Sequence, residues 1–129
     1  MNPDDPIGLT FPLELPLIEP FATVLIMTVV PEAIRGSWFE SGERPPKEDL
    51  ERISRRIETQ LAPQFGHPVH PAIWVHALFV CVHFFYRSAT AIEDPEEAER
   101  QTSALDAAHA LVYGLKHHHN LYELYLRMW

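Results

Sequence analysis

The sequence contains a single cysteine, so an internal disulfide framework is excluded. Cys81 lies within an apolar stretch, where burial would destabilise the thiolate that nucleophilic catalysis requires. A lone buried thiol fits a reducing compartment, and the residues after Met1 lack the basic and apolar regions of a signal peptide. These features predict a cytoplasmic protein.

Glycine and positive charge are also scarce, and each shortage excludes a class of function. The five glycines are dispersed, so no glycine-rich loop is available to cradle a phosphate. Ten Lys and Arg residues stand against 18 Asp and Glu residues, which gives a net charge of −8 without a basic stripe. Direct binding to nucleic acid is therefore not expected. The acidic surface either provides solubility or meets a basic partner.

What the sequence does contain fits one domain. A chain of 129 residues that is 47% hydrophobic can form a single core. The 12 prolines are grouped between apolar segments and separate structural elements. The expected fold is all-α, a four-helix-type bundle of three clear helices and a fourth near residues 20–30. An extended arm is expected over residues 1–19, and a single helical domain over 20–129.

Three segments carry the pattern of a helix. Residues 46–62 place an apolar side chain every three or four positions, which predicts one buried stripe. Residues 71–91 are apolar on nearly every side, and this predicts a helix at the centre of the fold. The last helix begins with Asp94 as its cap and Pro95 at its first position, and it is expected to continue to the C-terminus. The stripe of the first segment consists of Leu50, Ile53, Ile57 and Leu61.

The segment from Phe21 to Val30 leaves helix and strand open. Its β-branched residues favour a strand, whereas Pro20 at a helix start favours a helix. No second strong strand is available for pairing, so a helix is preferred. The arm before it alternates apolar residues with Pro12 and Pro16, which suits an edge strand or a polyproline segment laid along a surface.

The end of the last helix is predicted to need a covering surface. Apolar residues follow a heptad-type spacing from Ala104 onward and cover most of the helix circumference after His118. The last helix is expected to be longer than its antiparallel neighbour, so its final turns would project beyond it. Either a second copy or another protein covers these turns, or the arm at 7–18 folds back over them. The expected partner-binding residues are Leu121, Tyr122, Tyr125 and Trp129.

A second partner-binding patch is expected at Trp38 and Phe39. Two adjacent large aromatic residues in a loop that contains Gly36 and Ser37 either plug the core from outside or form an exposed binding spot.

Eight histidines raise the possibility of a metal site. In an antiparallel hairpin that turns near residue 93, His76 comes level with His109, and His70 comes level with His118. A helical bundle can hold a transition metal such as zinc between facing helices in this way. The sequence has no His-x3-His, no Glu-x-x-His and no Cys-x-x-Cys motif of the kind that binds metals. Ordinary surface or partly buried histidines are therefore the simpler interpretation, and no cofactor is expected.

The sequence favours a non-enzymatic protein-interaction module, either an oligomer or a small acidic subunit or modulator of a larger protein complex. A histidine-ligated helical metalloprotein is the alternative. A small membrane protein is the second alternative and rests on the apolar residues 69–86. His70, His76 and His83 in that segment would be costly in a bilayer, so a core helix is preferred.

Overall fold

The computed structural model describes residues 15–36, 38 and 44–121, and every regular element in this part of the chain is helical. The predicted all-α fold is confirmed. In chain order the elements are α1 (Leu15–Val24), the π-helical segment η1 (Leu25–Val29), α2 (Val30–Gly36), α4 (Lys47–Phe65), α5 (Pro71–Ala89) and α6 (Pro95–His118).

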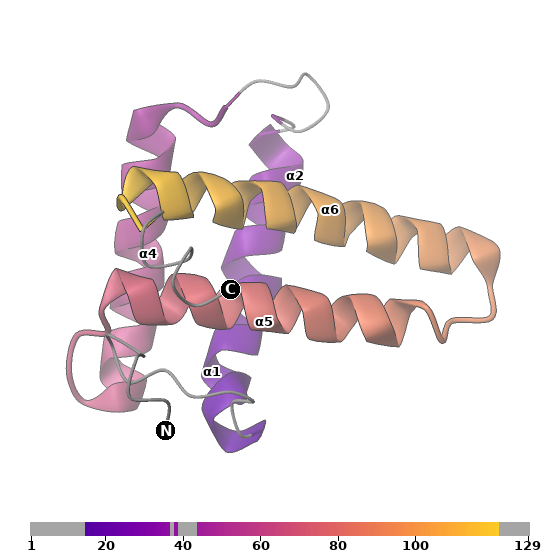
Figure 1. Cartoon of the computed structure of the whole chain (residues 1–129), viewed down its shortest axis with the longest axis horizontal. Helices are drawn as coiled ribbons and strands as arrows, with labels where there is room; N and C mark the ends of the chain where they lie inside the picture. Colours follow the sequence, from indigo (N-terminus) through magenta and orange to yellow (C-terminus); the bar gives the residue numbers. More distant parts are fainter. Residues whose placement is uncertain (1–14, 37, 39–43, 122–129) are drawn as a thin grey trace.

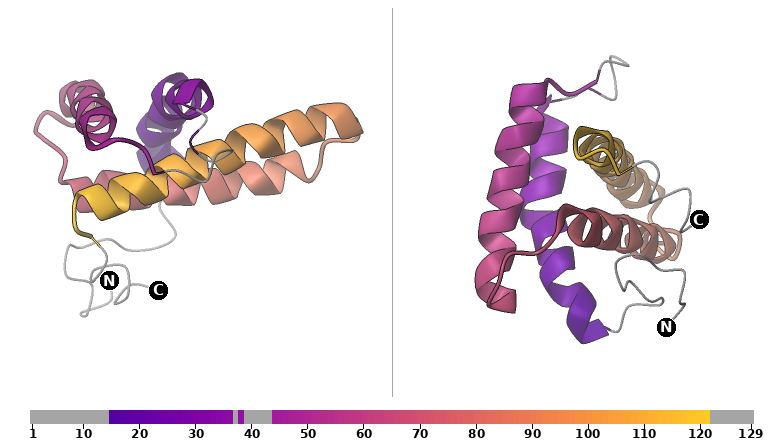
Figure 2. Two further views of the ribbon diagram at one scale, coloured as in Figure 1. Left: turned by 90° about the horizontal axis from the view of Figure 1, so that it is seen from above. Right: turned by 60° about the vertical axis from the view of Figure 1, so that its left-hand side comes forward.

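The helices form two layers that cross each other (Figure 1). α1, η1 and α2 follow one another without a break as a single column, and α4 lies beside this column. α5 and α6 form an antiparallel hairpin in the second layer, and Figure 2 shows the hairpin crossing one side of the first layer. α1 contacts α5, and α2 contacts α6. The core is therefore enclosed between two pairs of helices.

The core is built from the stripes that the sequence predicts. The stripe of α4 is buried, and α5 lies at the centre of the fold, in contact with both α1 and α6. α5 is also the one described helix whose length and composition would allow it to cross a membrane, and more than half of its most apolar part is buried inside the protein. A helix in the core of a protein can have the same length, the same apolar composition and this degree of burial. The fully buried side chains include Leu25, Ile53, Ile57, Leu61, Trp74, Leu78, Leu111 and Leu115.

The ambiguous segment at 21–30 is helical, as preferred, but part of it is wound more widely than an α-helix. In η1 the N–H of Val30 donates to the carbonyl of Leu25, five residues earlier. Pro31 follows directly and has no N–H to offer the carbonyl of Met27, and its ring would crowd that carbonyl in a regular α-helix. A π-helical turn next to a proline accommodates both constraints.

The prediction of an extended arm over residues 1–19 is wrong for its last five residues. α1 begins at Leu15, so residues 15–19 are helical. Pro16 falls in the first turn, where an N–H has no acceptor within the helix, so a proline there costs nothing. Residues 1–14 lie outside the described part of the chain.

Two helices end on residues in the left-handed conformation. α4 extends beyond the predicted 46–62 and is closed by Gly66, whose φ is 74°. α6 does not continue to the C-terminus as expected, because it ends at His118 and Asn120 has a φ of 56°. The N–H of Leu121 donates to the carbonyl of Lys116 at 3.0 Å, and the N–H of Asn120 donates to that of His117 at 3.1 Å. These two bonds make a Schellman motif with asparagine in the position that glycine usually occupies.

Candidate interaction surface

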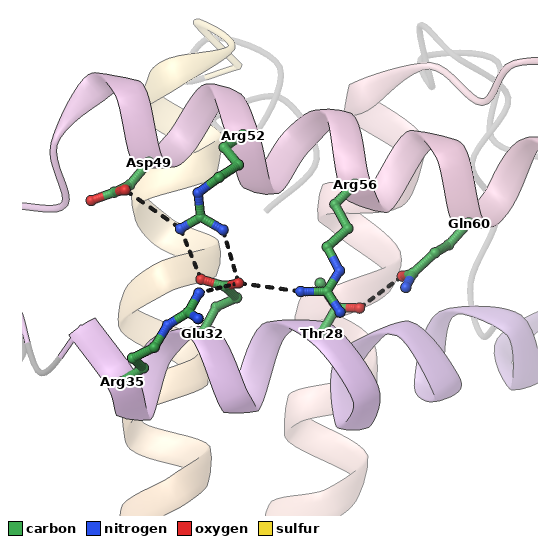
Figure 3. Close-up of polar contacts among 7 residues, drawn as sticks. All are labelled: Thr28, Glu32, Arg35, Asp49, Arg52, Arg56 and Gln60. Carbon is green, nitrogen blue, oxygen red and sulfur yellow. Dashed lines mark hydrogen bonds and ion pairs between the residues drawn. The ribbon is translucent and has the colours of Figure 1, made fainter.

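A buried carboxylate joins the N-terminal column to α4 (Figure 3). Glu32 in α2 is only 3% exposed, and Arg52 in α4 donates to its two oxygens at 2.9 and 3.0 Å. Arg56 donates to the same carboxylate at 3.3 Å, and Arg35 lies 2.5 Å from it. Asp49 accepts from Arg52 at 3.4 Å and completes the cluster. We refer to these five residues as the Glu32 cluster.

The cluster keeps the Glu32 carboxyl ionised although it is buried. The hydrogen bonds from Arg52 are the main cause, and Arg35 adds to them, so that the pKa of Glu32 is lowered to about 2 against the effect of burial. Hydrogen bonds to a charged carboxylate are stronger than those between neutral groups, and a two-pronged arginine contact also fixes geometry. The cluster therefore sets how α2 lies on α4.

A second polar contact lies one turn earlier in the column. The fully buried Thr28 donates its hydroxyl to the side-chain oxygen of Gln60 in α4 at 2.8 Å (Figure 3). Thr28 and Glu32 are four residues apart, so both face α4 from one side of the column. The column is consequently held in one rotational position.

The opposite side of the same column is apolar and exposed. Ile26 is 52% exposed, Met27 is 64% exposed and Ile34 is 51% exposed, and Pro31 between them is also exposed. We call Ile26, Met27, Pro31 and Ile34 the outer face. Soluble proteins seldom leave neighbouring large apolar side chains in water unless the surface meets another molecule.

Charged residues mark the two ends of the outer face. Glu19 and Arg35 are exposed, and the one charged residue between them in the chain is the buried Glu32. The face is therefore a strip without exposed charge, with a negative group at its N-terminal end and a positive group at its C-terminal end.

The partner-binding residues predicted from the sequence have a different arrangement. Leu121 is only 4% exposed and belongs to the core, because the chain turns at Asn120 instead of continuing as a helix. Its assignment as a partner contact stays a prediction, and in this chain alone its side chain packs against the core. Trp38 is half-buried against the core and lies over Gly36, where an added Cβ would come within 2.4 Å of its ring. The other predicted contacts, Phe39, Tyr122, Tyr125 and Trp129, lie outside the described residues.

Within the described residues, His109, His70 and His118 each have contacts other than the predicted pairing. The His109 ring lies 5.3 Å from that of Phe79 and 6.1 Å from that of His83. His70 caps α5 by accepting the N–H of Ala72 at 3.0 Å. His76 is buried in α5. Within residues 15–36, 38 and 44–121, no three His, Cys, Asp or Glu side chains gather in a way that could hold a metal ion.

His118 lies beside a histidine that the sequence did not single out. The rings of His118 and His119 are 4.9 Å apart, and His119 also packs edge-on against Trp74 at 5.3 Å. His119 Nε2 and the Ser54 hydroxyl are 2.9 Å apart and share a hydrogen bond. Burial, followed by the nearby His118 and His70, lowers the pKa of His119 to about 4. His119 is thus a neutral residue that ties the end of α6 to α4.

Comparisons with protein-family models, with curated proteins and with solved structures find no match to this chain. A function for it therefore has to be argued from its own surface.

The sequence carried a signal for the outer face. Residues 21–30 are apolar apart from two threonines, so a helix there is apolar on every side, yet the core needs only one of those sides. The same pattern predicts a covered surface at the C-terminal segment. The Glu32 cluster had no such signal, because Glu32 and Arg52 meet only through the packing of α2 on α4.

Proposed function

We propose that this protein is a non-enzymatic interaction module that associates with a second copy of itself through the outer face. The single observation that carries the proposal is the exposed apolar strip centred on Ile26 and Met27, on a helical column whose other side is fixed in place. Interfaces are enriched in such side chains, methionine among them, and depleted of charge at their centre.

The charges at the two ends of the strip favour a second copy as its occupant. Glu19 and Arg35 are 16 positions apart, about 24 Å along a helix, and Met27 is midway between them. If two columns pack antiparallel about a two-fold axis, Met27 meets Met27 of the other copy. The same arrangement brings each Glu19 opposite the other copy's Arg35. The Glu32 carboxylate is already bonded by Arg52 and Arg56, so Arg35 can form this additional pair.

The Glu32 cluster supports the same role. A helix that is already locked by polar contacts loses little conformational freedom on association, so more of the binding free energy is retained. Thr28 and Glu32 hold the column in position, and Ile26 and Met27 are presented outward as a consequence.

The test is the mass of the protein in solution. Light scattering and sedimentation over a range of concentrations should show a dimer for the unaltered chain. Met27→Glu places two carboxylates face to face at the two-fold axis and should raise the dissociation constant at least about tenfold. The circular dichroism spectrum should stay unchanged, because Met27 is exposed.

Phe84→Glu is the matched control, since Phe84 is an apolar residue of α5 that is 48% exposed. It should leave the dimer intact. A chain that stays monomeric at every concentration would refute self-association. Equal dissociation by both substitutions would show that the outer face is not the interface.

A further inference from the structure

A pocket of about 330 Å³ lies between α2, the start of α4 and α6. On α6 its wall is made of small residues, because Ala107, Ala110 and Gly114 recur at spacings of three and four and face the same way. The remaining apolar wall comes from Ala33, Trp38, Pro45, Leu50 and Leu111. Volume and lining are those of a site for a small, largely apolar molecule.

The polar groups of the pocket are cationic or neutral. Arg44, His117, His118 and Tyr113 line it, and none of its lining residues within 15–36, 38 and 44–121 is acidic. Lys116 lies beside it, with its Nζ 4.1 Å from the centre of the Tyr113 ring. Burial, and then Lys116 and Arg44, lower the pKa of His117, so these positive charges act on the same small volume.

We propose that this pocket binds an amphipathic monocarboxylate, with its apolar tail against Leu50, Leu111 and Trp38 and its carboxylate at Arg44. A guanidinium group matches a carboxylate in charge and shape. The first turn of α4 carries Glu48 and Asp49, and their negative charges disfavour the higher charge of a phosphate group.

The pocket is a site separate from the outer face. Ala33, which lines the pocket, is buried in the protein, whereas Ile26 and Met27 point to solvent. Binding in the pocket and self-association therefore rest on different residues and can fail independently.

The experiment is calorimetric titration of the full chain with octanoate, and with 1-octanol and octylammonium as probes of the same tail length. Octanoate should bind, and the two other probes should bind at least about tenfold more weakly, since they lack the charge that Arg44 recognises. Arg44→Gln should weaken octanoate binding roughly threefold to tenfold. Lys47→Gln removes a positive charge nearby that does not line the pocket, and it should leave the affinity unchanged.

Ala110→Leu tests the apolar part of the site. Ala110 is exposed on α6, so the larger side chain can be added without disturbing the core, and it should lower octanoate affinity at least about fivefold by filling the pocket. Absence of octanoate binding to the unaltered chain would overturn the proposal. Equal binding of 1-octanol, or equal loss with Arg44→Gln and Lys47→Gln, would overturn it as well.

Discussion

Arg52 places both of its terminal nitrogens on the carboxylate of Glu32, at 2.9 and 3.0 Å, and thereby ties α4 to α2. Together with the hydrogen bond from Thr28 to Gln60, this contact links the helical column to the rest of the first layer. Because it fixes the column, it also decides which side chains the column presents to solvent.

Replacing Glu32 by glutamine should cost about 2 to 3 kcal/mol of unfolding free energy, because it leaves several arginines facing an uncharged group in a buried position. Urea denaturation followed by circular dichroism measures the loss. Glu97→Gln is the control, since it removes a carboxylate from an exposed ion pair with Arg100, and it should have no measurable effect. Equal effects of the two substitutions would contradict a special role for Glu32.

The same carboxylate predicts how stability depends on pH in acid. Its pKa is about 2 in the folded protein and close to the ordinary 4.5 in the unfolded chain, so the unfolded chain binds more protons between these values. The contribution of Glu32 is complete above about pH 4.5 and declines as the pH falls towards 2. The difference in unfolding free energy between the unaltered protein and Glu32→Gln should therefore shrink over this range. A constant difference would contradict the lowered pKa.

His119 predicts a second pH dependence in a higher range. Its pKa is lowered from 6.5 to about 4, so the unfolded chain again binds more protons between these values, and stability falls as the pH decreases from about 6.5 to about 4. Two-dimensional NMR of the histidine rings should show that His119 remains neutral at pH 5. His119→Gln should remove that titration and flatten the stability profile above pH 4.5. Titration of every imidazole near pH 6.5 would be incompatible with the buried contact to Ser54 and Trp74.

Two glycines should respond in opposite ways to replacement by alanine. A Cβ at Gly114 would meet Leu50 Cδ2 and Pro45 Cγ at 3.5 Å, which is ordinary contact, so Gly114→Ala should stabilise α6 by about 0.5 to 1 kcal/mol. A Cβ at Gly36 would come within 2.4 Å of the Trp38 ring, so Gly36→Ala should lower the melting temperature. A gain in stability from Gly36→Ala would show that Trp38 does not pack there.

Charge reversal at the ends of the outer face should distinguish a two-fold antiparallel interface from other modes of association. Glu19→Arg would place like charges opposite each other in the proposed dimer and should weaken it. Combining Glu19→Arg with Arg35→Glu restores opposite charges and should recover dimerisation. Glu99→Arg makes the same change of charge on an exposed position of α6 and should have no effect. Failure of the double variant to recover, with its helix content intact, would exclude the antiparallel arrangement.

Local patterns in the sequence were sufficient to predict much of the fold. The spacing of Leu50, Ile53, Ile57 and Leu61 identified the buried side of α4. The N-terminal cap of α6 formed as expected, with Asp94 accepting the N–H of Glu96 at 3.1 Å. These features depend on residues within a few positions of one another, so a sequence pattern can specify them.

The features that were missed depend on a single backbone conformation or on distant contacts. The apolar spacing of the last helix continues past Asn120 without a change, but one residue in the left-handed conformation is enough to end the helix. Leu121 consequently joins the core. The Glu32 cluster and the contact of His119 with Ser54, 65 positions apart, exist only once the helices are packed.

The π-helical turn before Pro31 has a consequence for the evolution of this chain. A π-helical turn contains one more residue than an α-helical turn would over the same length. The segment η1 therefore corresponds to an α-helix with one residue inserted. Loss of one residue from 25–29 would remove the wider turn, and it would rotate Glu32 away from Arg52 by about 100°, the rotation of one residue in a helix. Homologous chains that lack this extra residue should therefore place a residue other than the counterpart of Glu32 opposite Arg52.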